Sequence, residues 1–95
     1  MDEQLNVIQV FVADKIAFTR EQRKMTQTQL SKKVGISRAS IVNMESYRQA
    51  ISLTRLYDIA TVLNVSIHDL LPDMAFYRKN KGKKIRRVIS YEIED

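Results

Sequence analysis

Apolar residues at the beginning of the chain recur at intervals of three and four, which is the period of an amphipathic α-helix. The pattern runs from about Leu5 to Lys24, and no glycine or proline interrupts it. It therefore predicts one long first helix. The residues that set its period are Val7, Ile8, Phe11, Ile16, Ala17 and Arg20.

Two shorter helices are predicted next, each from the residue that would cap its start. Thr26 is followed three residues later by Gln29, the spacing of a capping box, and Gly35 can take the left-handed conformation that ends a helix. Ser37 is the predicted N-cap of the helix after this turn, which continues to about Ser46.

The region from Ser52 to Pro72 predicts two further helices, after a loop over residues 47–51. Ser52 caps the fourth helix, and Ser66 with Asp69 forms a second capping box that opens a last short helix. The apolar stripe of the fourth helix comprises Leu53, Leu56, Ile59, Ala60 and Leu63. Five helices joined by short connections predict an all-α bundle.

The chain changes character after this bundle. Residues 78–87 (RKNKGKKIRR) form a basic run, and residues 87–93 (RVISYEI) alternate between apolar and polar positions, which indicates a β-strand. We therefore expect a helical domain over residues 1–73. Residues 74–95 are expected to form a basic linker and a C-terminal β-strand extension that serves for dimerisation.

The stretch from residue 27 to residue 46 meets the requirements of a helix-turn-helix unit. The two helices of such a unit cross steeply, so one position must be small and the turn needs a residue that tolerates positive φ. Ser31 fills the first position and Gly35 the second. The apolar anchors are Leu30, Val34, Ile36, Ile41 and Met44. The alternative is an ordinary helical hairpin with a glycine turn.

Over about Ile16 to Leu71 the chain resembles the Cro/repressor-like (XRE) helix-turn-helix family. The resemblance rests on MTQTQL, the turn KKVGIS, Ile41 with Glu45, and SLTRLYDIATVLNVSIHDLL. It implies a five-helix domain that binds operator DNA, in most family members as a dimer. It also implies an internal ion pair between Arg20 and Glu45.

The chain departs from the family pattern after the third helix. The family usually has glycine two residues after the glutamate and proline four residues further on, where this chain has Tyr47 and Ile51. Thr19 also replaces a usual leucine in the first helix. The loop after the third helix is therefore expected to differ in shape from that of the family.

The third helix carries the candidate base contacts. With Ile41 and Met44 facing inward, a step of about 100° per residue places Ala39, Val42 and Asn43 on the opposite side. In the family, residues near the start of this helix, where Arg38 stands here, reach base edges. Arginine bonds guanine O6 and N7, asparagine bonds adenine N6 and N7, and apolar side chains meet thymine methyl groups. The predicted base contacts are Arg38, Ala39, Val42 and Asn43.

Phosphate contacts are expected around the same unit. Gln27 matches the family position whose side chain and amide hold a phosphate at a helix N-terminus. The full predicted set is Gln27, Lys33, Ser37, Ser40 and Arg48.

The charge distribution agrees with a polyanionic partner. The net charge of the 95 residues is +5, but residues 20–55 alone carry eight basic and two acidic residues, and residues 78–87 carry seven basic residues and none that is acidic. The remaining segments are acidic. The basic run can be read as an arm along the duplex, as a connector to the strand, or as a solubilising tail.

Composition excludes several other classes of function. The chain has no cysteine and one histidine, so disulfides, cysteine nucleophiles and a metal site are not expected. No cofactor is expected, and the chain is not predicted to be an enzyme. The acidic start is unlike a signal peptide, and its apolar run is too short to span a membrane. The expected location is the cytoplasm.

The predicted function is sequence-specific regulation of transcription, by repression rather than activation, with double-stranded DNA as partner. A homodimer would bind an inverted-repeat operator. Its expected interface combines the extended first helix with the strand, which would pair across a two-fold axis. The predicted interface residues are Phe11, Phe18, Ile89, Tyr91 and Ile93. The alternative is an antitoxin or anti-factor that binds a protein partner and autoregulates its own promoter.

Overall fold

The computed structural model describes residues 6–83, and within that range the chain is helical. The elements are α1 (Val7–Gln22), α2 (Gln27–Val34), α3 (Arg38–Glu45), α4 (Leu53–Leu63), the 3-10 helix η1 (Ile67–Leu70) and α5 (Met74–Asn80). The prediction of a helical bundle is confirmed. The strand predicted over residues 87–93 lies outside the described residues.

The predicted helix starts are confirmed by their hydrogen bonds. The Thr26 hydroxyl accepts from the Gln29 amide at 3.0 Å, and the Gln29 side chain accepts from the Thr26 amide at 2.8 Å, which completes the capping box. Ser37 caps α3 and Ser52 caps α4, each through its hydroxyl oxygen. These caps satisfy amide groups that the first turn of a helix leaves without intrahelical partners.

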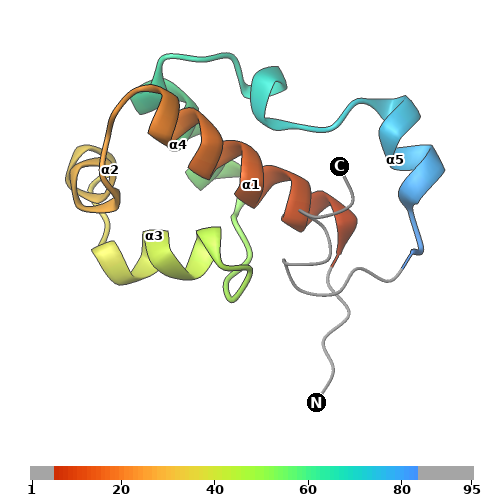
Figure 1. Ribbon diagram of the computed structural model, residues 1–95, viewed down its shortest axis with the longest axis horizontal. Helices are drawn as coiled ribbons and strands as arrows, with labels where there is room; N and C mark the ends of the chain where they lie inside the picture. The colour runs from red at the N-terminus through yellow and green to blue at the C-terminus, as the bar shows by residue number, and fades with distance from the viewer. Residues whose placement is uncertain (1–5, 84–95) are drawn as a thin grey trace.

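The core lies between α1 and the other helices of the bundle. Figure 1 shows α1 running through the middle of the molecule, with α2 and α3 at one end and α5 at the other. The buried residues of the cluster are Val12, Ile16, Leu30, Ile41, Met44, Leu56, Ile59, Ala60, Leu63 and Leu70. Because every helix up to η1 contributes to this cluster, the position of α3 is set by packing on both α1 and α2.

The first helix is shorter than its pattern predicted. It begins at Val7 after the N-cap Asn6 and ends at Gln22, since Lys24 takes a left-handed conformation with φ 57°. Beyond the helix, the Arg23 Nε atom donates to the Leu63 carbonyl at 2.8 Å. That bond ties the end of α1 to the end of α4.

The linker predicted from residue 74 onward begins instead with a helix. Asp73 caps α5 by accepting from the Phe76 amide at 2.7 Å. The rings of Phe76 and Phe11 lie 5.1 Å apart between centroids and are tilted by 58°, a favourable aromatic arrangement. The basic run therefore starts on an ordered helix that packs against α1, and Arg78 and Lys79 form its last turn.

Candidate nucleic-acid interface

The turn between α2 and α3 has the geometry that its residues predicted. Gly35 has φ 89°, and its amide donates to the Ser31 carbonyl at 2.8 Å, as does that of Ile36 at 3.0 Å. Ser31 itself is buried, 3% exposed, and its hydroxyl donates to the Thr28 carbonyl at 2.8 Å. Ser31 is thus a small buried residue on α2, the helix that packs against α3, and its polar group is satisfied.

On the third helix, two of the four predicted base contacts are exposed and the other two are partly buried. Ile41 and Met44 are 1% and 4% exposed, which fixes the inner face of the helix in the core. On the other side Arg38 and Ala39 are exposed, and Asn43 is partly buried. Val42 is also partly buried. Figure 1 shows α3 along one edge of the molecule, so this outer face is accessible from one side.

A buried ion pair holds α3 against α1. The Arg20 Nε atom lies 2.8 Å from Glu45 Oε2, and Arg20 Nη2 lies 2.9 Å from Glu45 Oε1, so the pair is bidentate. The exposed fractions of the two side chains are 10% and 7%. The hydrogen bonds to Glu45 raise the pKa of Arg20 although burial alone would lower it. The predicted internal pair is confirmed.

Gln27 extends this pair to the surface. Its Nε2 donates to Glu45 Oε1 at 3.0 Å, and its Oε1 accepts from Arg38 Nη2 at 3.4 Å. A continuous chain of polar contacts therefore runs from Arg20 through Glu45 and Gln27 to the exposed Arg38. Sequence patterns did not reveal this role of Gln27, because its partners lie 18 and 11 residues away along the chain.

The remaining predicted phosphate contacts surround α3. Lys33, Ser37 and Arg48 are exposed, and Ser40 is partly buried. The Ser37 hydroxyl accepts from the Ser40 amide at 3.0 Å, so it already serves as the cap. Gln27 and Lys33 lie on α2, Ser37 in the turn before α3, Ser40 on α3 and Arg48 in the loop after it.

In the loop after α3, Tyr47 adopts the left-handed backbone conformation that glycine favours. Tyr47 has φ 68°, its amide donates to the Met44 carbonyl at 3.3 Å, and the Arg48 amide donates to the Asn43 carbonyl at 2.8 Å. These two bonds form a Schellman motif. A residue with a Cβ in this conformation costs roughly 1–2 kcal/mol. The Tyr47 hydroxyl donates to Asp14 Oδ1 on α1, a contact that glycine cannot make.

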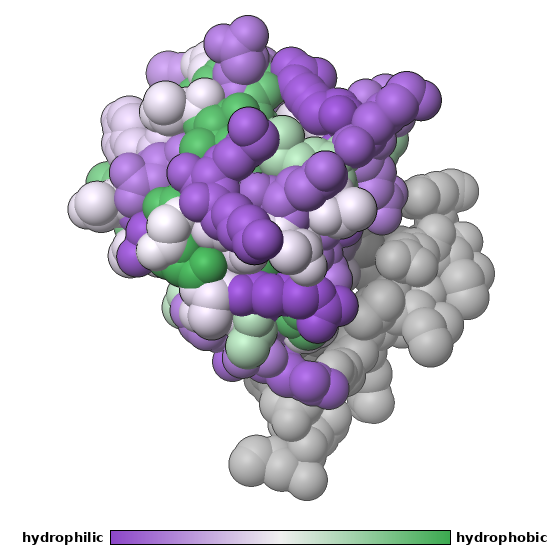
Figure 2. Space-filling model, turned by 90° about the vertical axis from the view of Figure 1, so that its left-hand side faces the viewer, coloured by the Kyte–Doolittle hydropathy of each residue, from purple (hydrophilic) through white to green (hydrophobic). Residues whose placement is uncertain are grey.

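The basic residues of the region 20–55 divide into two groups. Arg20 and Arg23 bond inside the molecule, and Arg55 pairs with Asp58 at 3.2 Å. The interpretation of this whole region as one polyanion-facing block is therefore too broad. Besides Arg23, which is exposed but bonded to the Leu63 carbonyl, the exposed basic residues of this region are Lys24, Lys32, Lys33, Arg38 and Arg48. Figure 2, which views the molecule from the side of α2, shows hydrophilic residues over much of that face.

The predicted dimer residues are placed differently from one another. Phe11 is partly covered by Phe76, whereas Phe18 is 57% exposed, with Lys15 Nζ 5.9 Å from its ring centroid. Val12, which belongs to the same apolar start of α1, is a core residue. The other predicted interface residues, Ile89, Tyr91 and Ile93, lie outside the described residues.

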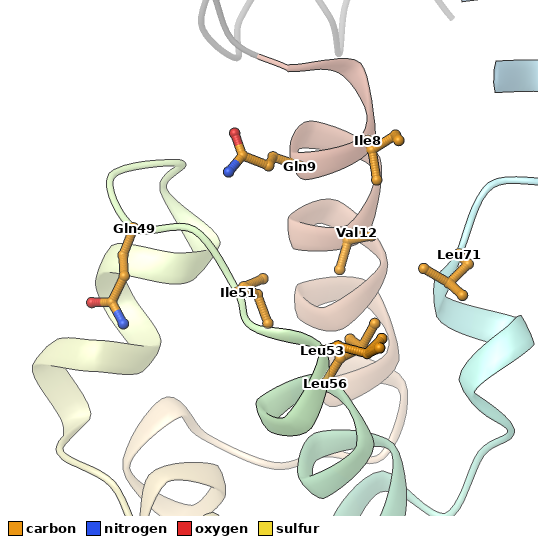
Figure 3. Close-up of a pocket in the computed structure, with 8 residues that line it drawn as sticks. All are labelled: Ile8, Gln9, Val12, Gln49, Ile51, Leu53, Leu56 and Leu71. Carbon is orange, nitrogen blue, oxygen red and sulfur yellow. The ribbon is translucent and has the colours of Figure 1, made fainter. Parts of the chain in front are cut away.

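An apolar hollow was not predicted from the sequence. It has a volume of about 190 Å³ and opens between α1, the loop before α4, and the segment after η1 (Figure 3). The residues that line it are Ile8, Gln9, Val12, Gln49, Ile51, Leu53, Leu56 and Leu71. Of these residues Leu53 is 65% exposed, and Tyr57, one turn later on α4, is 54% exposed. Leu53 and Tyr57 stand four positions apart, which places both on one side of α4. This spacing is the feature of the sequence that could have indicated an apolar surface here.

Known proteins resemble the same part of the chain. A family model described as helix-turn-helix matches residues 16–70. An HTH-type transcriptional regulator of Archaeoglobus fulgidus is 48% identical over 46 residues, which make up 48% of this chain and 66% of that protein.

Solved structures show the same helical unit. The structure of SinR, the master regulator for biofilm formation, in complex with DNA matches with a TM-score of 0.59 and 25% identity, over 62% of this chain and 95% of that one. Hydroxypropylphosphonic acid epoxidase from S. wedmorenis matches with a TM-score of 0.66 and 29% identity over 70% of this chain. The match covers only 36% of the epoxidase, and it is confined to its helix-turn-helix part.

Proposed function

We propose a function from one premise: the chain belongs to the XRE-type helix-turn-helix family of DNA-binding transcription regulators. The family and the curated relative are regulators and not enzymes. The proposed function is repression of transcription in the cytoplasm by a homodimer that binds an inverted-repeat operator.

The observation that carries the proposal is the setting of Arg38 at the start of α3. Its guanidinium is exposed, and it is held at 3.4 Å from Gln27, which is itself bonded to the buried Arg20–Glu45 pair. An arginine that is oriented before binding loses less side-chain freedom when it bonds the O6 and N7 atoms of guanine. We therefore assign Arg38 to a guanine in the major groove.

The other proposed contacts follow from position. Asn43 is assigned to an adenine, and Ala39 and Val42 to thymine methyl groups, since all three lie opposite the buried face of α3. Phosphate contacts are assigned to Gln27, Lys33, Ser37, Ser40 and Arg48. In this arrangement the phosphate contacts fix the register of α3, and the base contacts supply the sequence preference.

The proposed homodimer has apolar surface available on the helical body. Leu53, which lines the hollow shown in Figure 3, is 65% exposed, and Tyr57 on α4 and Phe18 on α1 are exposed as well. A two-fold interface uses the same surface of both protomers, so a projecting side chain next to a hollow can fill the hollow of the partner. The C-terminal residues Ile89, Tyr91 and Ile93 remain the other proposed contribution to the interface.

Selection of bound DNA from a random pool tests this function. The expected result is an enriched inverted repeat whose half-sites are about one helical turn apart, roughly 10 base pairs from centre to centre. A pool without any enriched sequence would contradict sequence-specific binding. An enriched sequence without two-fold symmetry would contradict the homodimer.

A further inference from the structure

The hydrogen bond between Tyr47 and Asp14 connects the residue after α3 to the middle of α1. We infer that this contact is a latch that positions Arg48 on the DNA backbone and holds the last turn of α3 in place. The inference rests on the proposed function, since it assumes that α3 and Arg48 bind DNA. It assigns Tyr47 as a positioning residue that does not itself touch the DNA.

The direction of Arg48 depends on the backbone of Tyr47. Both the Arg48 amide and the Gln49 amide donate to the Asn43 carbonyl, at 2.8 and 3.2 Å. This geometry requires the left-handed conformation of Tyr47, with φ 68°. Any other conformation of Tyr47 would open these bonds and turn Arg48 away from its present direction.

Tyr47 occupies a conformation that a side chain with a Cβ disfavours, so something must hold it there. Its hydroxyl bonds Asp14, which lies 33 residues earlier on α1. The residues flanking Asp14 on that helix include Ala13 and Ile16, each 1% exposed and therefore fixed in the core. The latch thus joins the loop to a part of α1 whose neighbouring residues are buried in the core.

Asn43 is linked to the latch through its main chain. Its carbonyl accepts the two loop amides, while its side chain is on the face of α3 assigned to bases. Loss of the latch should therefore weaken two DNA contacts at once: the phosphate contact of Arg48 and the base contact of Asn43. A tyrosine that only filled space would affect neither.

The test measures binding of the full chain to its selected operator over a series of salt concentrations. The variants are Tyr47→Phe, Arg48→Ala and the double variant. Each phosphate contact contributes about 0.9 to the slope of log K against log salt concentration. Because the proposed homodimer carries two copies of Arg48, we expect Tyr47→Phe and Arg48→Ala each to reduce the magnitude of the slope by about 1.8. The double variant should then lose little more than either single variant.

The controls separate positioning from folding. Tyr47→Gly is the matched variant, because glycine takes the left-handed conformation without strain and needs no hydroxyl bond to stay there, so the Arg48 contact and the slope should be kept. Unchanged affinity and slope in Tyr47→Phe would overturn the inference, as would full additivity with Arg48→Ala or an Arg48→Ala slope like that of the unmodified chain. Failure of the unmodified chain to bind any DNA would instead overturn the proposed function.

Discussion

At the scale of single residues, Glu45 connects three helices through one carboxylate. Its Oε2 accepts from Arg20 Nε, and its Oε1 accepts from both Arg20 Nη2 and Gln27 Nε2. Arg20 Nη1 also donates to the Met25 carbonyl at 2.8 Å. A buried cation with all these partners is stable, but it becomes costly as soon as the carboxylate loses its charge.

Replacement of Glu45 by glutamine should therefore destabilise the fold strongly. The amide leaves Arg20 buried without a counter-charge, and we expect a loss of about 3–5 kcal/mol in the free energy of unfolding. Urea denaturation measures it. Asp58→Asn is the matched control, because the Arg55–Asp58 pair is 35% and 47% exposed, and an exposed pair contributes only about 0–1 kcal/mol. Equal losses in the two variants would refute a special role of the buried pair.

The base assignments make a different prediction. Asn43→Ala and Arg38→Ala should each cost about 1–3 kcal/mol of binding free energy on the preferred operator and relax the choice of one base pair per half-site. The measurement is titration of each variant against operators with every base at each position. A variant that binds all sequences more weakly by the same factor has lost a phosphate contact, and its assignment to a base is then wrong.

At the scale of elements, the helix starts could be predicted because each depends on residues three positions apart. Thr26 with Gln29 and Ser66 with Asp69 form capping boxes where the spacing predicted them. The start of α5 has a similar signal, because Asp73 accepts from the amide of Phe76 three residues later. This helix was not predicted, because the segment that contains the basic run from Arg78 was interpreted as a linker. Local patterns thus located every element as far as η1.

Contacts between elements were less accessible to the sequence. The inward side of α3 followed from Ile41 and Met44, because a helical period determines which residues share a face. The bond from Gln27 to Arg38 and that from Tyr47 to Asp14 depend on how α1, α2 and α3 pack together. No spacing along the chain encodes that packing directly.

The capping box of α2 can be tested directly. Thr26→Ala should lower the free energy of unfolding by about 1 kcal/mol, because the first-turn amide of Gln29 loses its acceptor. Thr28→Ala serves as the control, since Thr28 is exposed inside the same helix and its side chain caps nothing. Thermal unfolding followed by circular dichroism compares the two. A smaller loss for Thr26→Ala than for Thr28→Ala would show that the cap contributes nothing.

At the scale of the whole molecule, the proposed dimer has two candidate sources. One is the C-terminal residues beyond the described part of the chain, and the other is the apolar surface at Leu53, Tyr57 and the hollow beside them. Within residues 6–83, no helix is long and apolar enough to cross a membrane.

Deletion of residues 84–95 distinguishes the two sources. We expect the truncated chain to keep its helices, to sediment as a monomer at micromolar concentration and to bind the full operator far more weakly. If it remains dimeric, the interface belongs to the helical body, and Leu53→Glu should then disrupt it.

The short helix α5 is expected to open more readily than the rest of the bundle. The helix has seven residues and none of them is buried, and an isolated helix of that length is not stable in water. The ring of Phe76 packs on that of Phe11 and attaches the helix to α1. The free energy that opens α5 is therefore well below that of global unfolding, and its amides should exchange with solvent long before those of α1. Each opening uncovers the ring of Phe11, so the apolar surface of α1 fluctuates in extent while the rest of the bundle stays folded.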